Sequence, residues 1–207
     1  MENLTKKELK KKEFLGCCLE EFVAKGIYEA SVKDIAKRAN ITERTAFRYY
    51  NTKQEMVLES VRLLWENYMN RVFTDYSSLI KPGSTRENIK AILMLYSKIF
   101  LTDKQRLLFV AEAEAYLTRC GVSIYTAEGF PLKINPASPL ASIINKGINN
   151  GEINKANVMD LYYSSFDTLL GFMEKLAIEY YNGRITDEDA IRRLDILCDI
   201  LSNAYFN

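Results

Sequence analysis

Apolar residues recur along most of this chain with the three- and four-residue spacing of amphipathic helices. In the first segment this spacing predicts a helix from Lys6 to Lys25, and Gly26 follows it, as is common just after a helix end. The period stays helical almost throughout, so the sequence predicts an all-α protein. Its longer helices are expected at residues 52–76, 85–101, 103–120, 140–149, 156–182 and 186–205.

Two short helices, 31–39 and 43–50, are predicted after the first one. Ser31 is placed to cap the first of them and Thr42 to cap the second, because both hydroxyls precede an apolar helical pattern. Asn40, between them, tolerates the left-handed backbone conformation that a tight turn needs. Two short helices joined in this way form a helix-turn-helix.

The second short helix is expected to have one buried side and one exposed side. Ala46 and Tyr50 are four residues apart, so with Ile41 they can pack on the first two helices. The remaining residue types suit a DNA major groove, where arginine pairs with guanine and apolar edges meet the thymine methyl. The alternative is a surface helix with scattered charges. The residues left exposed are Glu43, Arg44, Thr45, Phe47, Arg48 and Tyr49.

The block from Phe14 to Val61 resembles a known family. It reads FLGCCLEEFVAKGIYEASVKDIAKRANITERTAFRYYNTKQEMVLESV and is similar to the N-terminal DNA-binding domain of TetR-family bacterial transcriptional regulators. The resemblance implies a three-helix helix-turn-helix domain over residues 1–55 and a helical effector-binding and dimerisation domain over residues 56–207. It implies double-stranded DNA as a partner, contacted by Ser31, Lys33, Thr42, Glu43, Arg44, Thr45, Phe47, Arg48, Tyr49 and Lys53.

Three residues depart from the family pattern. Asn40 replaces the usual glycine, and its tolerance of the left-handed conformation makes this change harmless. Phe47 replaces the common tyrosine and lacks the hydroxyl that would bond a phosphate. Glu43 is acidic at a DNA-facing position, where it is repelled by phosphate but can accept a hydrogen bond from cytosine N4.

The helices predicted at 156–182 and 186–205 each carry two apolar stripes, which indicates burial on both sides. Two such helices from each of two chains would form a four-helix bundle, the homodimer interface that the resemblance implies; the alternative is a large monomer core. A two-fold dimer spaces its recognition helices by about 34 Å or somewhat more and predicts a palindromic operator. The expected interface residues are Tyr162, Leu169, Phe172, Met173, Leu176, Leu194, Leu197 and Leu201.

A regulator of this kind needs an input, and an apolar or aromatic small molecule is expected. Core packing is the commoner role for the bulky residues that suit such a pocket. Glu112 and Glu114 lie in an otherwise apolar run, where a carboxylate facing the pocket would select cationic ligands and one facing solvent would not. The expected ligand-binding residues are Trp65, Tyr68, Met69, Phe73, Tyr96, Phe100, Phe109, Glu112, Tyr116, Tyr125 and Phe166.

Charge and composition narrow the class of protein. The net charge is +1, yet residues 1–55 hold twelve basic and nine acidic residues, and five lysines fall between Lys6 and Lys12. This distribution favours a polyanionic partner, the alternative being a solvated helix face. A signal peptide, a membrane-spanning window and metal-ligand cysteine spacing are absent from the sequence, so a cytoplasmic protein without metal or cofactor is expected.

Three functions stay open at this point. The resemblance favours a repressor released from DNA by a small molecule, but a DNA-binding dimer governed by a protein partner, docked at residues 121–139, fits the same pattern. An enzyme is not expected, because histidine and every familiar catalytic motif are missing. Glu112 and Glu114 would be its best acid–base candidates.

Overall fold

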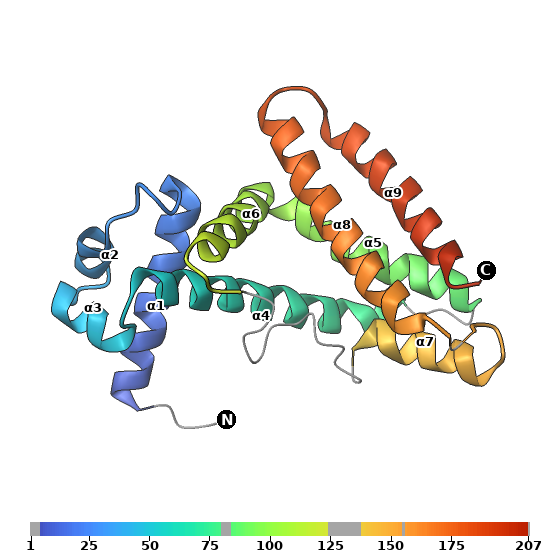
Figure 1. Ribbon diagram of the computed structural model, residues 1–207, viewed down its shortest axis with the longest axis horizontal. Coiled ribbons are helices and arrows are strands. Elements are labelled where there is room, and N and C mark those ends of the chain that lie inside the picture. The colour runs from blue at the N-terminus through green and yellow to red at the C-terminus, as the bar shows by residue number, and fades with distance from the viewer. Residues whose placement is uncertain (1–4, 80–83, 124–137, 155, 207) are drawn as a thin grey trace. The chain divides into compact units, whose positions relative to one another are not determined.

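The computed structural model describes residues 5–79, 84–123, 138–154 and 156–206, and Figure 1 shows its helices in chain order. These described residues contain helices and no strand, which confirms the predicted all-α fold. Most of residues 121–139, where a protein partner would dock in the alternative function, lies outside them. The helices are α1 (Lys6–Lys25), α2 (Val32–Arg38), α3 (Glu43–Tyr49), α4 (Lys53–Leu79), α5 (Thr85–Thr102), α6 (Lys104–Arg119), α7 (Pro139–Asn149), α8 (Val158–Tyr181) and α9 (Asp187–Ala204).

The chain forms two compact units, Met1–Asn67 with Leu108–Phe130 and Tyr68–Leu107 with Pro131–Asn207. Two of the boundaries between them fall inside helices, one in α4 and one in α6. The sequence predicts a single division after residue 55, whereas the compact units divide inside α4 and α6. Met56 is completely buried and belongs to the first unit, as does α6 from Leu108 onward.

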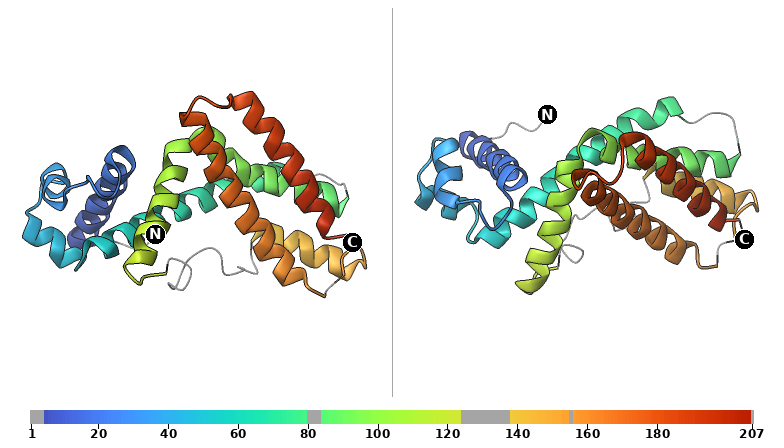
Figure 2. Two further views of the ribbon diagram at one scale, coloured as in Figure 1. Left: turned by 45° about the horizontal axis from the view of Figure 1, so that its top comes forward. Right: turned by 90° about the horizontal axis from the view of Figure 1, so that it is seen from above.

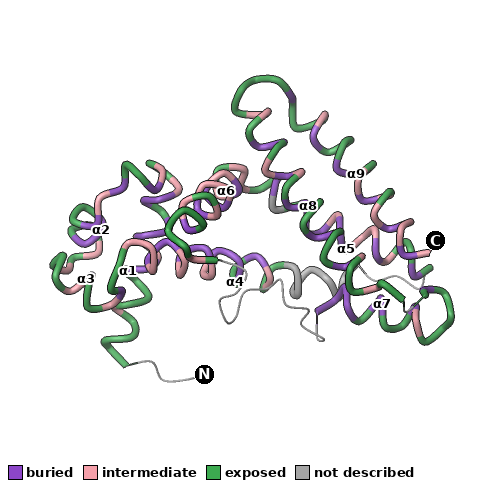
Figure 3. Tube along the Cα trace, in the orientation of Figure 1, coloured by how far each residue is buried: buried purple, intermediate pink, exposed green. Residues whose placement is uncertain are grey.

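The core of the first unit is built where α1, α2, α3 and the start of α4 turn their apolar sides inward. Phe14, Phe22 and Ile35 are completely buried, as is Met56. Figure 3 shows that buried and exposed stretches alternate along the helices of this unit. This alternation is the amphipathic pattern from which the helices were predicted.

The second unit is centred on α5, which contacts α7, α8 and α9. The views in Figure 2 show α8 and α9 running side by side, and these two helices also contact each other. Ile89, Leu93 and Phe100 on α5 are buried, together with Leu176 on α8 and Leu194 on α9. None of the described helices is long and apolar enough to cross a membrane.

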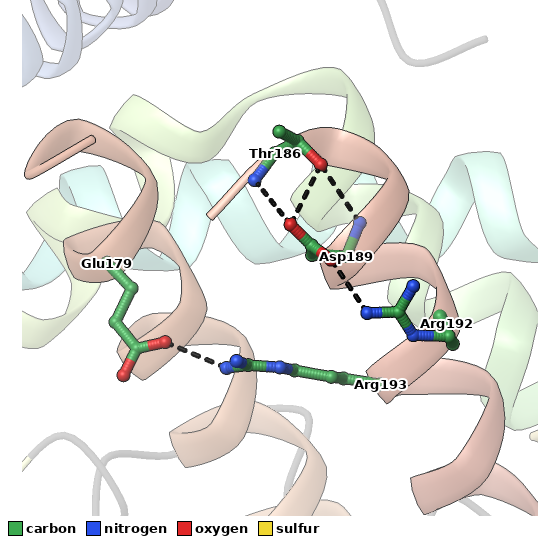
Figure 4. A network of polar contacts seen from close by, with 5 residues as sticks. All are labelled: Glu179, Thr186, Asp189, Arg192 and Arg193. Carbon is green, nitrogen blue, oxygen red and sulfur yellow. Dashed lines mark hydrogen bonds and ion pairs between the residues drawn. The ribbon is translucent and has the colours of Figure 1, made fainter. Parts of the chain in front are cut away.

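Polar side chains at the helix ends fix where α9 and α6 begin. Thr186 and Asp189 form a capping box at the start of α9, and Arg193 of α9 pairs with Glu179 of α8 across 2.9 Å (Figure 4). At the start of α6, Asp103 accepts the hydrogen bond from the Arg106 N–H at 3.3 Å. Asp103 and not Thr102 caps α6, because the Thr102 hydroxyl donates its hydrogen bond to the Lys98 carbonyl within α5.

Candidate nucleic-acid interface

The α2–α3 pair forms the predicted helix-turn-helix. The Ser31 hydroxyl accepts a hydrogen bond from the Asp34 N–H at 3.4 Å, and the Thr42 hydroxyl accepts one from the Thr45 N–H at 3.2 Å. Asn40 adopts φ = 54°, the left-handed conformation expected of it. The turn between the two helices therefore has the geometry that its residue types predicted.

Two residues anchor α3 to the rest of the first unit. Ala46 is completely buried, and Tyr50, which ends the helix, is only 5% exposed. The Phe14 ring of α1 packs against both Tyr49 and Tyr50, with ring centroids 6.1 and 6.2 Å apart. With seven residues and one buried side chain, α3 depends on these contacts for its position, because so short a helix is unstable alone.

The opposite side of α3 is open to solvent. Phe47 is 39% exposed, an unusual position for an aromatic ring without a partner surface. The Thr42 and Thr45 hydroxyls are hydrogen-bonded to each other at 2.9 Å, and Thr45 and Tyr49 are half-buried. This side offers guanidinium donors, a carboxylate acceptor and an apolar ring for base edges. Its exposed members are Glu43, Arg44, Phe47 and Arg48.

The α2 helix offers a second, smaller polar surface. Lys33 is exposed in its first turn, whereas Ser31 is half-buried and its hydroxyl caps the helix. Glu21 of α1 is buried and pairs with Lys25 on its own helix and with Arg38 of α2. Hydrogen bonds from Lys25 and Arg38 hold the pKa of the Glu21 carboxyl below its usual value.

Lys53 has a partner inside the protein. Its Nζ donates a hydrogen bond to the Ala30 carbonyl oxygen at 2.7 Å, and burial lowers the pKa of this ammonium group. The resemblance described above implies that Lys53 contacts DNA. In the structure this side chain holds the segment that leads into α2.

The same segment is held from its other end by α6. A Glu112 oxygen accepts a hydrogen bond from the Ile27 N–H at 2.8 Å, across 85 residues of sequence. Gly26, at φ = 83°, leaves room for this carboxylate, which lies 3.4 Å from where a β-carbon would stand. Phe22 stacks on Phe109 on the α6 side of this contact, with ring centroids 6.2 Å apart.

We call the segment 26–30, held by Glu112 and Lys53, the clamped turn. Sequence reasoning missed it, because no local pattern reveals a hydrogen bond between residues so far apart. From the sequence, Glu112 is among the expected effector-binding residues and would be an acid–base candidate if the protein were an enzyme. In the structure its carboxylate accepts the hydrogen bond from the Ile27 N–H.

Comparison with known proteins agrees with this geometry. Residues 18–60 match the family of bacterial regulatory proteins described as the tetR family.

The N-terminal helix-turn-helix domain belongs to the TetR family.

Similar folds extend over nearly the whole chain. A TetR-family regulator structure from Mesorhizobium loti MAFF303099 is 17% identical, with a TM-score of 0.69 over 99% of this chain and 100% of that one. One from Syntrophomonas wolfei str. Goettingen is 19% identical, with a TM-score of 0.66 over 94% and 95%. The fatty acid degradation regulator FadR from Bacillus halodurans is 16% identical, with a TM-score of 0.64 over 96% and 95%. A comparison with curated proteins gave no match.

These comparisons establish the fold of the chain and the family that residues 18–60 match. At such low identities the solved structures show the fold alone, while the family match covers the helix-turn-helix itself. The chain therefore has the fold of a TetR-family transcriptional regulator, and its N-terminal domain is of the DNA-binding type.

The residues predicted to bind an effector are divided between the two units. In the first unit Trp65 is buried, Phe109 stacks on Phe22, and Tyr116 meets Tyr28 edge-on with ring centroids 5.5 Å apart. The side chain of Phe73 and all of Tyr125 lie outside the described residues. The members in the second unit are Tyr68, Met69, Tyr96, Phe100 and Phe166.

Within the second unit the structure brings two of these residues together. Tyr96 of α5 and Phe166 of α8 meet edge-on, with ring centroids 5.8 Å apart, and both are buried. Burial raises the pKa of the Tyr96 hydroxyl. A separate cavity of about 230 Å³ lies between α5 and α9, and none of the residues predicted to bind an effector lines it. It is lined by Ala91, Met94, Leu95, Ser97, Lys98, Leu101, Ile191 and Leu194.

The residues predicted to form the dimer interface lie mostly inside the protomer. Phe172, Leu197 and Leu201 are half-buried, and the other five are buried in the core of the second unit: Tyr162, Leu169, Met173, Leu176 and Leu194. A different set of apolar residues is exposed on the two helices. It consists of Met159, Tyr163, Ile178 and Tyr181 on α8 and Ile191, Ile196 and Ile200 on α9.

Proposed function

We propose that this protein is a homodimeric repressor that binds a palindromic operator and is released from it by a small molecule. The observation that carries the proposal is the exposed side of α3. Its two arginines, one glutamate and one aromatic ring stand in solvent, while Ala46 and Tyr50 hold the helix in place. A helix presented in this way can enter a major groove without unfolding or rearranging.

Each exposed residue of α3 has a chemical counterpart on DNA. Arg44 and Arg48 can each donate two hydrogen bonds to a guanine, and Phe47 can contact a thymine methyl. Glu43 can accept from a cytosine amino group. Thr42, Thr45 and Tyr49 carry hydroxyls that suit phosphate oxygens.

Phosphate contacts would position this reading helix. Lys33 is free to reach a phosphate from α2, next to the Ser31 cap. The Lys53 ammonium donates one of its three N–H groups to the Ala30 carbonyl, so the other two can reach a phosphate oxygen. DNA binding would then add a phosphate contact to a side chain that already holds the clamped turn.

Dimerisation is supported by the exposed apolar residues of α8 and α9. Ile196 and Ile200 are 54% and 59% exposed, and they lie on the side of α9 opposite the buried Leu194 and Cys198. An apolar surface of this kind is stabilised when a second copy removes it from water. We therefore place the interface on this exposed set, and the two-fold dimer predicts an operator of two inverted half-sites.

The effector is an apolar or aromatic small molecule, bound among the buried rings of the second unit. Tyr96 and Phe166 are the pair of predicted pocket residues that the structure brings together. The ligand acts by preferring a dimer geometry that does not fit the operator. To move such an equilibrium almost completely, that preference must be about 5.5 kcal/mol.

The test is selection of binding sites from random duplex DNA by the purified protein at physiological salt. The proposal predicts an inverted repeat, bound by two chains per duplex. Placed at a promoter, the selected site should lower expression of a reporter gene, and an apolar compound that stabilises the protein against heat should restore it. Selection of a single half-site, or of no sequence at all, would rule out the palindromic dimer.

A further inference from the structure

The inner face of α1 changes character partway along the helix. Phe14 and Cys18 on this face are completely buried in the core of the first unit. Lys11 and Lys7 continue the same face toward the N-terminus, three and seven residues before Phe14. Both lysines are exposed. The face that packs the core therefore becomes a basic surface as soon as α1 leaves the core.

This basic surface lies next to the end of α3. The Lys11 ammonium stands 4.5 Å from the centre of the Tyr50 ring, and Tyr50 is the residue that ends α3. One turn further on, Phe14 packs against Tyr49 and Tyr50. Figure 1 shows α1 extending past this end of α3 within the same unit.

The first turns of α1 are capped although they bury almost nothing. The Thr5 hydroxyl accepts a hydrogen bond from the Glu8 N–H, and Glu8 accepts one from the Thr5 N–H at 2.7 Å, so the helix starts with a complete capping box. This box stabilises a helical start that has no apolar packing of its own. It keeps the lysines in a fixed register relative to Phe14.

Most of the positive charge on this segment is not neutralised. Lys10 is paired with Glu13 at 2.7 Å, whereas Lys6, Lys7, Lys11 and Lys12 form no ion pair with any described residue. Lys12 lies on a different side of α1 from Lys7 and Lys11. The helix therefore offers one basic face beside α3, formed by Lys7 and Lys11, while Lys6 and Lys12 lie on other sides of α1.

We infer that Lys7 and Lys11 bind phosphates of the operator backbone that flank the bases read by α3. This inference rests on the proposed DNA-binding function and adds a second contact surface to it. Phosphate contacts contribute affinity and register but no sequence information. The α1 lysines therefore set how tightly the protein holds any duplex, and α3 sets which duplex it prefers.

The experiment compares two double variants that each remove two positive charges. In Lys7→Gln/Lys11→Gln the basic face is lost, and in Lys146→Gln/Lys175→Gln two exposed lysines of the second unit are lost. Affinities for the selected operator and for a scrambled duplex are measured between 50 and 300 mM salt. Lys12→Gln is the control within α1, and Lys7→Gln alone serves if the Lys11 change disturbs Tyr50.

Loss of four phosphate contacts per dimer should lower the steepness of the logarithmic salt dependence by about 3.6. Both duplexes should weaken by at least about ten-fold at physiological salt, and their affinity ratio should stay unchanged. The two controls should keep the wild-type slope. If the wild-type protein binds the operator but Lys7→Gln/Lys11→Gln keeps the wild-type salt dependence, the inference is overturned while the proposed function stands. If the wild-type protein binds neither duplex, the proposed function fails and the inference falls with it.

Discussion

The two units expose opposite kinds of surface. In the first unit, α3 turns two arginines, a glutamate and a phenylalanine to solvent and buries only Ala46. In the second, α8 and α9 expose isoleucines and tyrosines although both helices already bury a full apolar side. The exposed side of α3, which we call the reading surface, can be recognised in the sequence because polar residues stand there between apolar ones. The exposed apolar residues of α8 and α9, which we call the association surface, cannot be recognised in this way, because they are of the same residue types as the core.

The largest effect is expected from breaking the association surface. Ile196→Glu/Ile200→Glu places two charges where we propose that a second copy packs, so the protein should become monomeric. Operator affinity should fall by about 100-fold, because two half-sites are no longer bound by one linked molecule. Analytical ultracentrifugation and duplex titration measure both effects.

Leu9→Glu is the control for this change, since Leu9 is also exposed but belongs to the first unit. This variant should have the mass of the wild-type dimer. A dimeric Ile196→Glu/Ile200→Glu protein would place the interface elsewhere on the chain.

The next effect concerns the reading surface. Arg48→Ala removes an exposed guanidinium from α3. Affinity for the operator should therefore fall by about 10- to 100-fold, which is the contribution of one bidentate contact to a base. The melting temperature should not change, because Arg48 is exposed. Arg184→Ala removes an exposed arginine outside the first unit and should leave both quantities at wild-type values. Equal losses in the two variants would point to general charge attraction.

A smaller effect is expected at the clamped turn. Glu112→Ala leaves the Ile27 N–H without its acceptor, which should cost about 1–3 kcal/mol of the free energy of unfolding. Glu112→Gln retains an acceptor oxygen and should lose much less. Hydrogen exchange at the Ile27 amide should rise in the alanine variant and not in the glutamine variant. Unchanged protection in Glu112→Ala would show that this hydrogen bond does not hold the turn.

The smallest effect is expected at Glu21. Glu21→Gln weakens the link between α1 and α2, at a cost of about 1 kcal/mol at neutral pH, because both basic partners are half in solvent. The folded protein lowers the Glu21 pKa, so this contribution is complete above the ordinary carboxyl pKa and is lost as the pH falls below about 4.5. Unfolding curves at pH 7 and pH 3.5 should therefore differ more for wild type than for Glu21→Gln.

Local features of the first unit were predictable from the sequence. The bounds of α1, the caps at Ser31 and Thr42 and the left-handed Asn40 all follow from residue types acting on their neighbours. The inward side of α3 followed from the spacing of Ala46 and Tyr50. Each of these features depends on residues that lie within a few positions of one another in the sequence.

Long-range features were not predictable. The bonds from Glu112 to Ile27 and from Lys53 to Ala30 join residues that are far apart along the chain. Likewise, the sequence could not separate the core stripe of α8 and α9 from the exposed one. Leu194 and Ile196 belong to the same apolar class, and only the packing of α5 decides which of them is buried.

The central claim is that α3 reads bases, and its most direct test is the base preference of Arg48→Ala. Each base pair of the selected operator is changed in turn, and the affinity of wild type and variant is measured for every duplex. The account predicts that the variant loses its preference at one position in each half-site and keeps it at the others. A uniform loss of affinity, with every base preference retained, would contradict it and make Arg48 a phosphate contact.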